Sequence, residues 1–219
     1  MKINLILPAI LLSLLASPAR SADVSQRLTI LHTNDVHGHL RPYSYPEISS
    51  LRSGSIIAGG MQASSLLGAF DLPARKDIGG IARRATIAAR IRADLAKHNT
   101  PVWLVDAGDL FYYSAFSNEY HGDADVLAMN QAGYDFGGLG NHEFEITLPQ
   151  LKKMIGDARF PFLCANVIET STKKPLTKPY EIRQIGGVRV GIFGLVEPGV
   201  GRSTAARDGL TAEDPMTSR

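Results

Sequence analysis

The residues of this chain best suited to chemistry lie where apolar runs end. Residues 28–33 read Leu-Thr-Ile-Leu-His-Thr, which has the composition of a β-strand, and Asp35 and His37 follow in a polar turn. Side chains two positions apart on an extended segment point the same way, so this carboxylate and this imidazole can converge on one ion. A turn that carries a surface histidine has the same pattern, so this motif needs support from elsewhere in the chain.

Two later segments repeat the arrangement. Residues 102–109 (Val-Trp-Leu-Val-Asp-Ala-Gly-Asp) form an apolar run that ends at Asp109. Residues 136–143 (Phe-Gly-Gly-Leu-Gly-Asn-His-Glu) form a shorter run that leads to Asn141 and His142. In an open α/β sheet the carboxyl ends of the strands face one crevice, where ligands bind. Three such strand ends therefore predict one shared site, which no single motif would do.

The side chains at these strand ends suit a pair of divalent metal ions. Carboxylate, imidazole and amide oxygen ligands fit Mn, Zn, Fe, Mg or Ca better than a thiolate site would. An aspartate that bridges two ions about 3.5–4 Å apart is a recurring device for hydrolysing phosphate esters. Gly38, Gly108 and Gly140 allow tight turns close to the ions. We therefore expect two divalent metal ions as cofactors.

These motifs resemble those of the calcineurin-like metallophosphoesterases. The resemblance is closer to the secreted bacterial 5′-nucleotidase and 2′,3′-cyclic-nucleotide phosphodiesterase branch, and it covers roughly residues 27 to 215. The matching segments are residues 31–38, 106–109, 125–134, 140–144, 160–166 and 187–194. The resemblance implies an α/β fold, a four-layer αββα sandwich, of which this sequence would be a C-terminally truncated portion.

The resemblance also implies a role for each motif residue. The metal ligands would be Asp35 and His37 for the first ion, Asp109 as the bridge, and Asn141 for the second ion. His142 would not be a ligand but would stabilise the transition state or protonate the leaving oxygen. Glu145 stands where the branch usually has an aspartate that orients this histidine. The attacking group would be a metal-bound hydroxide.

The chain departs from the branch in two further respects. Tyr112 and Tyr113 follow the bridging aspartate where the branch commonly has a Gln-Gly-Ser loop, so we expect them to reshape the mouth of the site. The family completes both metal shells with later histidines in Gly-His and Gly-His-x-His motifs, but His142 is the last histidine here. We therefore expect an incomplete catalytic domain without the substrate-gripping C-terminal domain of the nucleotidases.

The expected function is that of an exported phosphoesterase that hydrolyses nucleotides or related small-molecule phosphate esters. One alternative is a thiosulfohydrolase of sulfur oxidation built on a related scaffold, which the long insertion at residues 40–79 favours and the Gly-Asn-His-Glu motif disfavours. The other alternative is a non-catalytic product that keeps half a metal site.

The first 21 residues read as a signal peptide. Lys2 precedes a nearly continuous apolar stretch, and Ala19 and Ser21 place small residues at the −3 and −1 positions of a cleavage site. The apolar stretch is shorter than the ~20 residues that span a bilayer, so we expect no stable membrane anchor. Cleavage would leave residues 22–219 as the catalytic portion, in the periplasm or outside the cell. Removing Lys2 and Arg20 also removes the formal charge of +2, which argues against binding of nucleic-acid polymers.

Hydrophobic periodicity supplies the remaining elements. The pattern predicts helices over residues 80–98, 123–132 and 148–157 and two strands joined at Gly186-Gly187. The resemblance to the family implies the start of a further helix over 211–219. The helix at 80–98 would expose Arg83, Arg84, Arg90 and Arg92 as a solvated face. The insertion at 40–79 reads as a surface excursion or a lid over the substrate. Cys164 is the single cysteine, and its apolar surroundings predict a buried core position.

Overall fold

The computed structural model describes residues 26–45, 75–112 and 114–216. The predicted signal peptide, the interior of the insertion at residues 46–74, and Tyr113 lie outside the described residues. The two ends of the insertion are described. They form β2 (Tyr43–Tyr45) and β3 (Arg75–Ile78), which pair with each other in an antiparallel ribbon.

A parallel sheet of four strands forms the centre of the structure. Its strands are β1 (Thr29–Thr33), β4 (Val102–Asp106), β5 (Phe136–Gly138) and β6 (Phe162–Leu163), in the order β1-β4-β5-β6. The chain returns to the start of each new strand through a helix, because parallel strands require a crossover connection. All three predicted strand ends therefore lie along one edge of the sheet.

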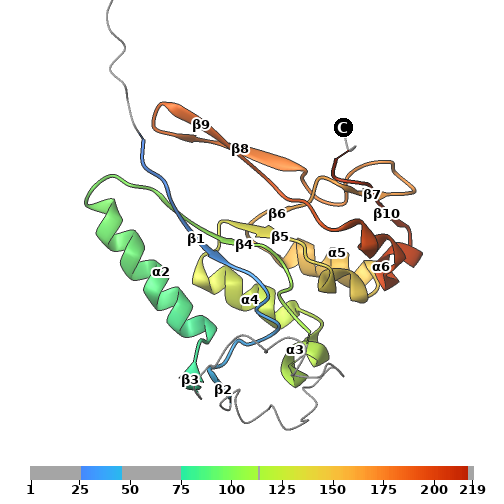
Figure 1. Cartoon of the computed structure of the whole chain (residues 1–219), viewed down its shortest axis with the longest axis horizontal. Coiled ribbons are helices and arrows are strands. Elements are labelled where there is room, and N and C mark those ends of the chain that lie inside the picture. The colour runs from blue at the N-terminus through green and yellow to red at the C-terminus, as the bar shows by residue number, and fades with distance from the viewer. Residues whose placement is uncertain (1–25, 46–74, 113, 217–219) are drawn as a thin grey trace, which may run out of the picture.

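The two faces of this sheet have different covers. Helices lie along one face and a β-hairpin lies over the other (Figure 1). These elements are α2 (Ile81–Ala96), α4 (Asp123–Ala132), α5 (Leu148–Asp157), β8 (Tyr180–Ile185) and β9 (Val188–Phe193). Side chains alternate along β4, so Leu104 joins the core beneath the helices while Trp103 joins the core beneath the hairpin. The α/β class is confirmed, and this helix–sheet–sheet order corresponds to the first three layers of the predicted sandwich.

The predicted helices begin and end close to their predicted positions. Residues 123–132 and 148–157 match α4 and α5, and α2 is two residues shorter at its C-terminus than predicted. Thr147 begins α5 with a capping box, in which its hydroxyl accepts the Gln150 N–H and the Gln150 side chain accepts the Thr147 N–H. The two strands joined at Gly186-Gly187 are confirmed as β8 and β9.

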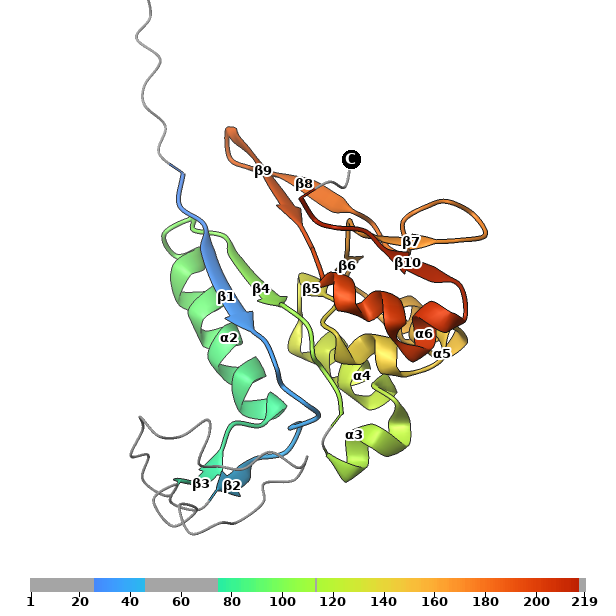
Figure 2. The same cartoon turned by 45° about the vertical axis from the view of Figure 1, so that its right-hand side comes forward.

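The smaller elements gather at two corners of the sheet. Near the carboxyl ends of β1 and β4 lie the β2–β3 ribbon and α3 (Ala115–Tyr120), as Figure 2 shows. Near α5 lie η2 (His142–Glu145), η3 (Pro198–Arg202) and α6 (Thr204–Arg207). The last pair of strands is β7 (Val167–Glu169) with β10 (Leu210–Ala212).

Two predictions are wrong. The segment predicted to start a helix at Thr211 instead pairs antiparallel with β7, because Leu210 is buried against the core. The arginines of α2 do not all face solvent. Arg84 donates a hydrogen bond to the Tyr134 hydroxyl, and Arg92 binds the Asp135 carboxylate at 2.8 Å. A single helix shows which side is polar, but it does not reveal the polar groups that another segment places against that side.

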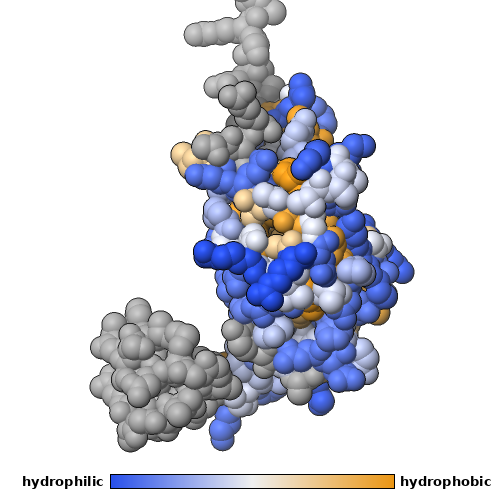
Figure 3. All heavy atoms as spheres, turned by 90° about the vertical axis from the view of Figure 1, so that its right-hand side faces the viewer, coloured by the Kyte–Doolittle hydropathy of each residue, from blue (hydrophilic) through white to orange (hydrophobic). Residues whose placement is uncertain are grey.

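The buried position predicted for Cys164 is confirmed. Cys164 is fully buried, and burial raises the pKa of its thiol to about 11, so it is un-ionised at neutral pH. The face seen in Figure 3 is mainly hydrophilic, with hydrophobic residues in scattered patches. The outer side of the hairpin exposes Tyr180, Ile182 and Phe193. Among the described residues, no helix is both long and apolar enough to cross a membrane.

Leu151→Ala is expected to lower the free energy of unfolding by about 2–5 kcal/mol, because Leu151 is fully buried where α5 meets the core. The matched change Leu127→Ala removes the same atoms from a side chain that is 57% exposed. It should alter the free energy of unfolding by less than about 0.5 kcal/mol. Urea unfolding of both variants measures the difference, and equal losses would show that the core is placed wrongly.

Candidate metal centre

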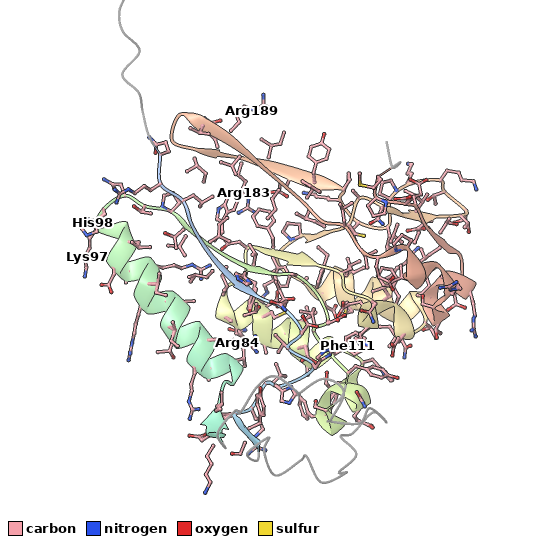
Figure 4. The ribbon with its side chains drawn as sticks, viewed as in Figure 1. Arg84, Lys97, His98, Phe111, Arg183 and Arg189 are labelled. Atoms are coloured by element: carbon pink, nitrogen blue, oxygen red, sulfur yellow. The ribbon has the colours of Figure 1, made fainter. Side chains whose placement is uncertain are left out.

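Three loops carry the predicted site residues, and they follow β1, β4 and β5. Successive peptide groups join the first two loops in a short hydrogen-bonded ladder. The N–H groups of Asp35, His37 and Gly38 donate to the carbonyl oxygens of Gly108, Asp109 and Leu110 at 3.0, 3.0 and 2.8 Å. The His37 Nδ1 atom lies 3.3 Å from the carbonyl oxygen of Phe111, which Figure 4 labels at the same corner. The ladder fixes the position of the loop after β1 relative to the loop after β4.

The backbone at three predicted metal ligands is left-handed. The φ angles are 50° at Asp35, 47° at His37 and 57° at Asp109. Aspartate and histidine occur in this conformation more often than most other residues, yet it still costs free energy and therefore clusters at functional sites. Gly108 has φ 104°, and a Cβ atom there would lie 2.1 Å from the Gly140 nitrogen. A glycine is thus required where the loops after β4 and β5 touch.

Ligand atoms from all three strand ends come together. One nitrogen or oxygen atom from each of His37, Asp109 and His142 lies within 4.8 Å of the others, and all three residues are partly buried. The Asp35 carboxylate is not part of this group. It is 58% exposed, and its Oδ1 atom lies 3.8 Å from the His37 Nε2 atom. Asn141 is exposed at the start of η2.

The residues present fit a divalent metal ion. Imidazole nitrogens and carboxylate oxygens are common ligands of Zn, Mn and Fe, and Asp35 and Asn141 offer further oxygen atoms in the adjoining loops. The structure therefore brings together part of the predicted ligand set, with His142 beside it. The individual assignments of Asp35, His37, Asp109 and Asn141 as ligands stay predictions.

The His142 ring has a neighbour on each of several sides. Its Nδ1 atom lies 3.0 Å from the Glu145 Oε1 atom. The Tyr112 ring stacks on it with centroids 5.5 Å apart, and the His37 ring meets it edge-on at 5.1 Å. With a carboxylate beside Nδ1, Nε2 is the ring nitrogen that can meet a substrate. The extra methylene of Glu145, compared with the usual aspartate, thus leaves this contact in place.

A cavity of about 260 Å³ adjoins this histidine. Tyr112 and Glu145 line it, together with His121 and Gln150. A second cavity, of about 480 Å³, begins at Gly38 and is lined mainly by the segment from His39 to Tyr43 and by Phe116. Both cavities lie next to loops that carry predicted site residues, so there is space for a small molecule beside the site.

Glu143 is a site residue that the sequence reasoning missed. Its side chain is 0% exposed, and its carboxylate accepts the N–H groups of Asp109, Leu110 and Gly140 at 2.9, 2.7 and 2.6 Å. Burial raises the pKa of Glu143 to about 7, although these three hydrogen bonds oppose the shift. The only sequence signal was an acidic residue directly before the apolar Phe144, inside the Gly-Asn-His-Glu motif.

Asp106 is a second buried carboxylate at the site. It accepts the Gly108 N–H at 2.8 Å and the Thr33 hydroxyl. The Thr33 hydroxyl lies 2.9 Å from the Tyr134 hydroxyl, which in turn accepts a hydrogen bond from Arg84. Burial raises the pKa of Asp106 to about 6, because the loss of hydration outweighs these favourable contacts. The network ties the end of β1 to the turn after β4.

The sequence and the fold of this chain are similar to those of known proteins. Residues 28–190 match the model of the calcineurin-like phosphoesterase family. The 5′-nucleotidase of Vibrio cholerae is 32% identical over 174 residues, which are 80% of this chain and 26% of that protein. The solved structure of a 5′-nucleotidase precursor from Thermus thermophilus has a TM-score of 0.64 and 31% identity over 87% of this chain and 32% of its own.

A more distant solved structure shares the fold alone. The sulfate thiohydrolase SoxB from Thermus thermophilus has a TM-score of 0.67 but only 20% identity, over 88% of this chain and 40% of that one. Against the relatives named here, the chain spans between about a quarter and two fifths of their length.

Asp106→Asn should remove part of the pH dependence of stability in the metal-free protein. The folded-state pKa of Asp106, about 6, lies above its unfolded value of 3.8, so folding takes up a proton between these values. The protonated Asp106 carboxyl therefore contributes its full stabilisation of the fold below about pH 4, and this stabilisation is lost as the pH rises through 6. Because asparagine cannot ionise, the free energy of unfolding of the variant should rise by roughly 1–3 kcal/mol relative to that of the original protein as the pH increases through this range.

Denaturant unfolding between pH 4 and 8 in the presence of a chelator measures this effect. Asp94→Asn is the matched control, because Asp94 is 73% exposed on α2. Asp94 pairs with Lys97 at 2.8 Å, and because exposed ion pairs contribute little, this control should differ from the original protein by less than about 1 kcal/mol over the whole range. A difference for Asp106→Asn that does not grow as the pH rises would contradict the assigned cause.

Proposed function

The chain belongs to the calcineurin-like phosphoesterase family, and from that premise we propose that it hydrolyses nucleotides or related small-molecule phosphate esters with two divalent metal ions. The observation that carries the proposal is the convergence of His37, Asp109 and His142 from three separate strand ends. The similarity to 5′-nucleotidases supports the class of substrate. The similarity to the sulfate thiohydrolase is one of fold alone, at 20% identity, so we favour phosphate esters as the class of substrate.

The resemblance to the family implies the proposed roles, and the positions of His37, Asp109 and His142 support them. Asp35, His37, Asp109 and Asn141 would hold the metal ions, which when bound would stabilise charge on the phosphoryl group and lower the pKa of a water molecule. His142 would donate a proton to the leaving oxygen from its Nε2 atom. Glu145, whose carboxylate lies 3.0 Å from Nδ1, would keep the opposite nitrogen protonated and the ring in its orientation.

His142→Ala is expected to lower kcat by about 10²–10⁴-fold, because the leaving oxygen would depart without a proton donor. The measurement is hydrolysis of AMP and of 2′,3′-cyclic AMP at Mn²⁺ concentrations that saturate each protein. Glu145→Gln should cause a smaller loss of kcat, because the imidazole remains but loses the carboxylate beside its Nδ1 atom.

His98→Ala is the matched control for this change. Figure 4 shows His98 at the end of α2 far from Phe111, and its side chain is exposed. The control should retain the original kcat. Hydrolysis by the His142 variant at the original rate would contradict the assigned role. Failure of the unaltered protein to hydrolyse any phosphate ester would contradict the proposed function itself.

We also propose that the protein is exported. The apolar stretch after Lys2 and the small residues at Ala19 and Ser21 support export, with cleavage before Ala22. When the gene is expressed in a bacterium, the exported fraction should contain a protein whose N-terminal sequence begins Ala-Asp-Val-Ser. Edman sequencing of that fraction checks this, and recovery only from the cytoplasm with Met1 retained would contradict it.

A further inference from the structure

We propose that Glu143 is a positioning residue that sets the distance between the loops after β4 and β5, and thereby the affinity of the site for its metal ions. The inference rests on the proposed metal centre. The Glu143 carboxylate acts on the backbone rather than on an ion. It accepts N–H groups from both loops, those of Asp109 and Leu110 in the loop after β4 and that of Gly140 in the loop after β5.

The geometry around Glu143 makes it the junction of all three loops. The loop that carries Asp35 and His37 is hydrogen-bonded to residues 108–110 through the backbone ladder. Residues 109 and 110 in turn donate both of their N–H groups to Glu143. The third loop is joined through the Gly140 N–H and through the His142 N–H, which donates to the Asp109 Oδ1 atom at 3.1 Å. Moving the Glu143 carboxylate would therefore move every predicted ligand.

The chemistry of the contact requires a carboxylate of this length. Three N–H donors converge on two oxygen atoms, and the side chain is inaccessible to solvent. Glutamine has one oxygen and an NH₂ group, so at least one N–H donor would face another donor. Such a pair repels, and the loops would separate to relieve it. Residues that orient ligands without binding the metal typically alter metal affinity by about 10- to 100-fold when they are changed.

Asn166 offers a matched control. It is also 0% exposed and also binds three backbone groups, because it accepts the Val196 N–H and donates to the carbonyl oxygens of Val196 and Glu213. These segments carry none of the predicted ligands. Asn166→Asp is therefore the reverse exchange of Glu143→Gln, at an equally buried position away from the site.

The experiment is a titration of the purified, chelator-treated chain with MnCl₂ by calorimetry, beside urea unfolding of each variant. Both variants should be less stable than the original protein. Glu143→Gln should raise the Kd for Mn²⁺ by about 10- to 100-fold, whereas Asn166→Asp should leave it within about twofold. An unchanged Kd in Glu143→Gln, or an equal rise in both variants, would overturn the positioning role.

A second measurement needs no variant. In the metal-free protein, the amide hydrogens of residues 109, 110 and 140 should exchange with solvent as slowly as those of the central strands, although all three lie in loops. Exchange at the rate of exposed loops would overturn the inference. Failure of the unaltered protein to bind Mn²⁺ would overturn the metal centre as well, whereas binding without hydrolysis would overturn only the proposed function.

Discussion

The parallel register of β1, β4 and β5 is the constraint on which the site depends. Thr33 pairs with Asp106, and Asp106 pairs with Gly137, so the three strands end at the same level. Each ladder hydrogen bond is worth only about 1 kcal/mol, but a shift of one residue would exchange the buried and exposed faces of a strand. Trp103 and Leu104 lie in different cores and oppose such a shift. The core therefore fixes the register, and the register brings the loops together.

The loops need more than the register, because their backbone is strained. Left-handed conformations at Asp35, His37 and Asp109 each cost free energy and would relax if the loops were independent. Hydrogen bonds between the loops oppose that relaxation, and the buried carboxylates of Asp106 and Glu143 accept N–H groups that would otherwise lack partners. The strain stays because no loop can relax alone, and loops held this way keep His37, Asp109 and His142 close together in the metal-free chain.

Much of this arrangement was predictable from the sequence, for a physical reason. Periodicity reports which side of an element is apolar, so α4 and α5 were found with their correct bounds, and strand ends identified the loops. Contacts between distant polar groups leave no such trace. The partners of Arg84 and the buried position of Glu143 depend on where other segments pack, and short apolar stretches such as Leu210–Ala212 fit a helix or a strand equally well.

The electrostatics of the site link folding to the binding of cations. Asp106 and Glu143 have raised pKa values because burial removes their hydration, and the Asp109 charge raises that of Glu143 further. In the metal-free chain the charge of Asp35 also raises the pKa of Asp106, so the predicted ligands Asp35 and Asp109 repel these two buried carboxylates. A cation held by the predicted ligands would reduce that repulsion, and the folded state would bind it more tightly than an unfolded chain, in which these residues are far apart. The carboxylates whose ionisation destabilises the metal-free fold as the pH rises are therefore the groups whose negative charge would favour binding of a divalent ion.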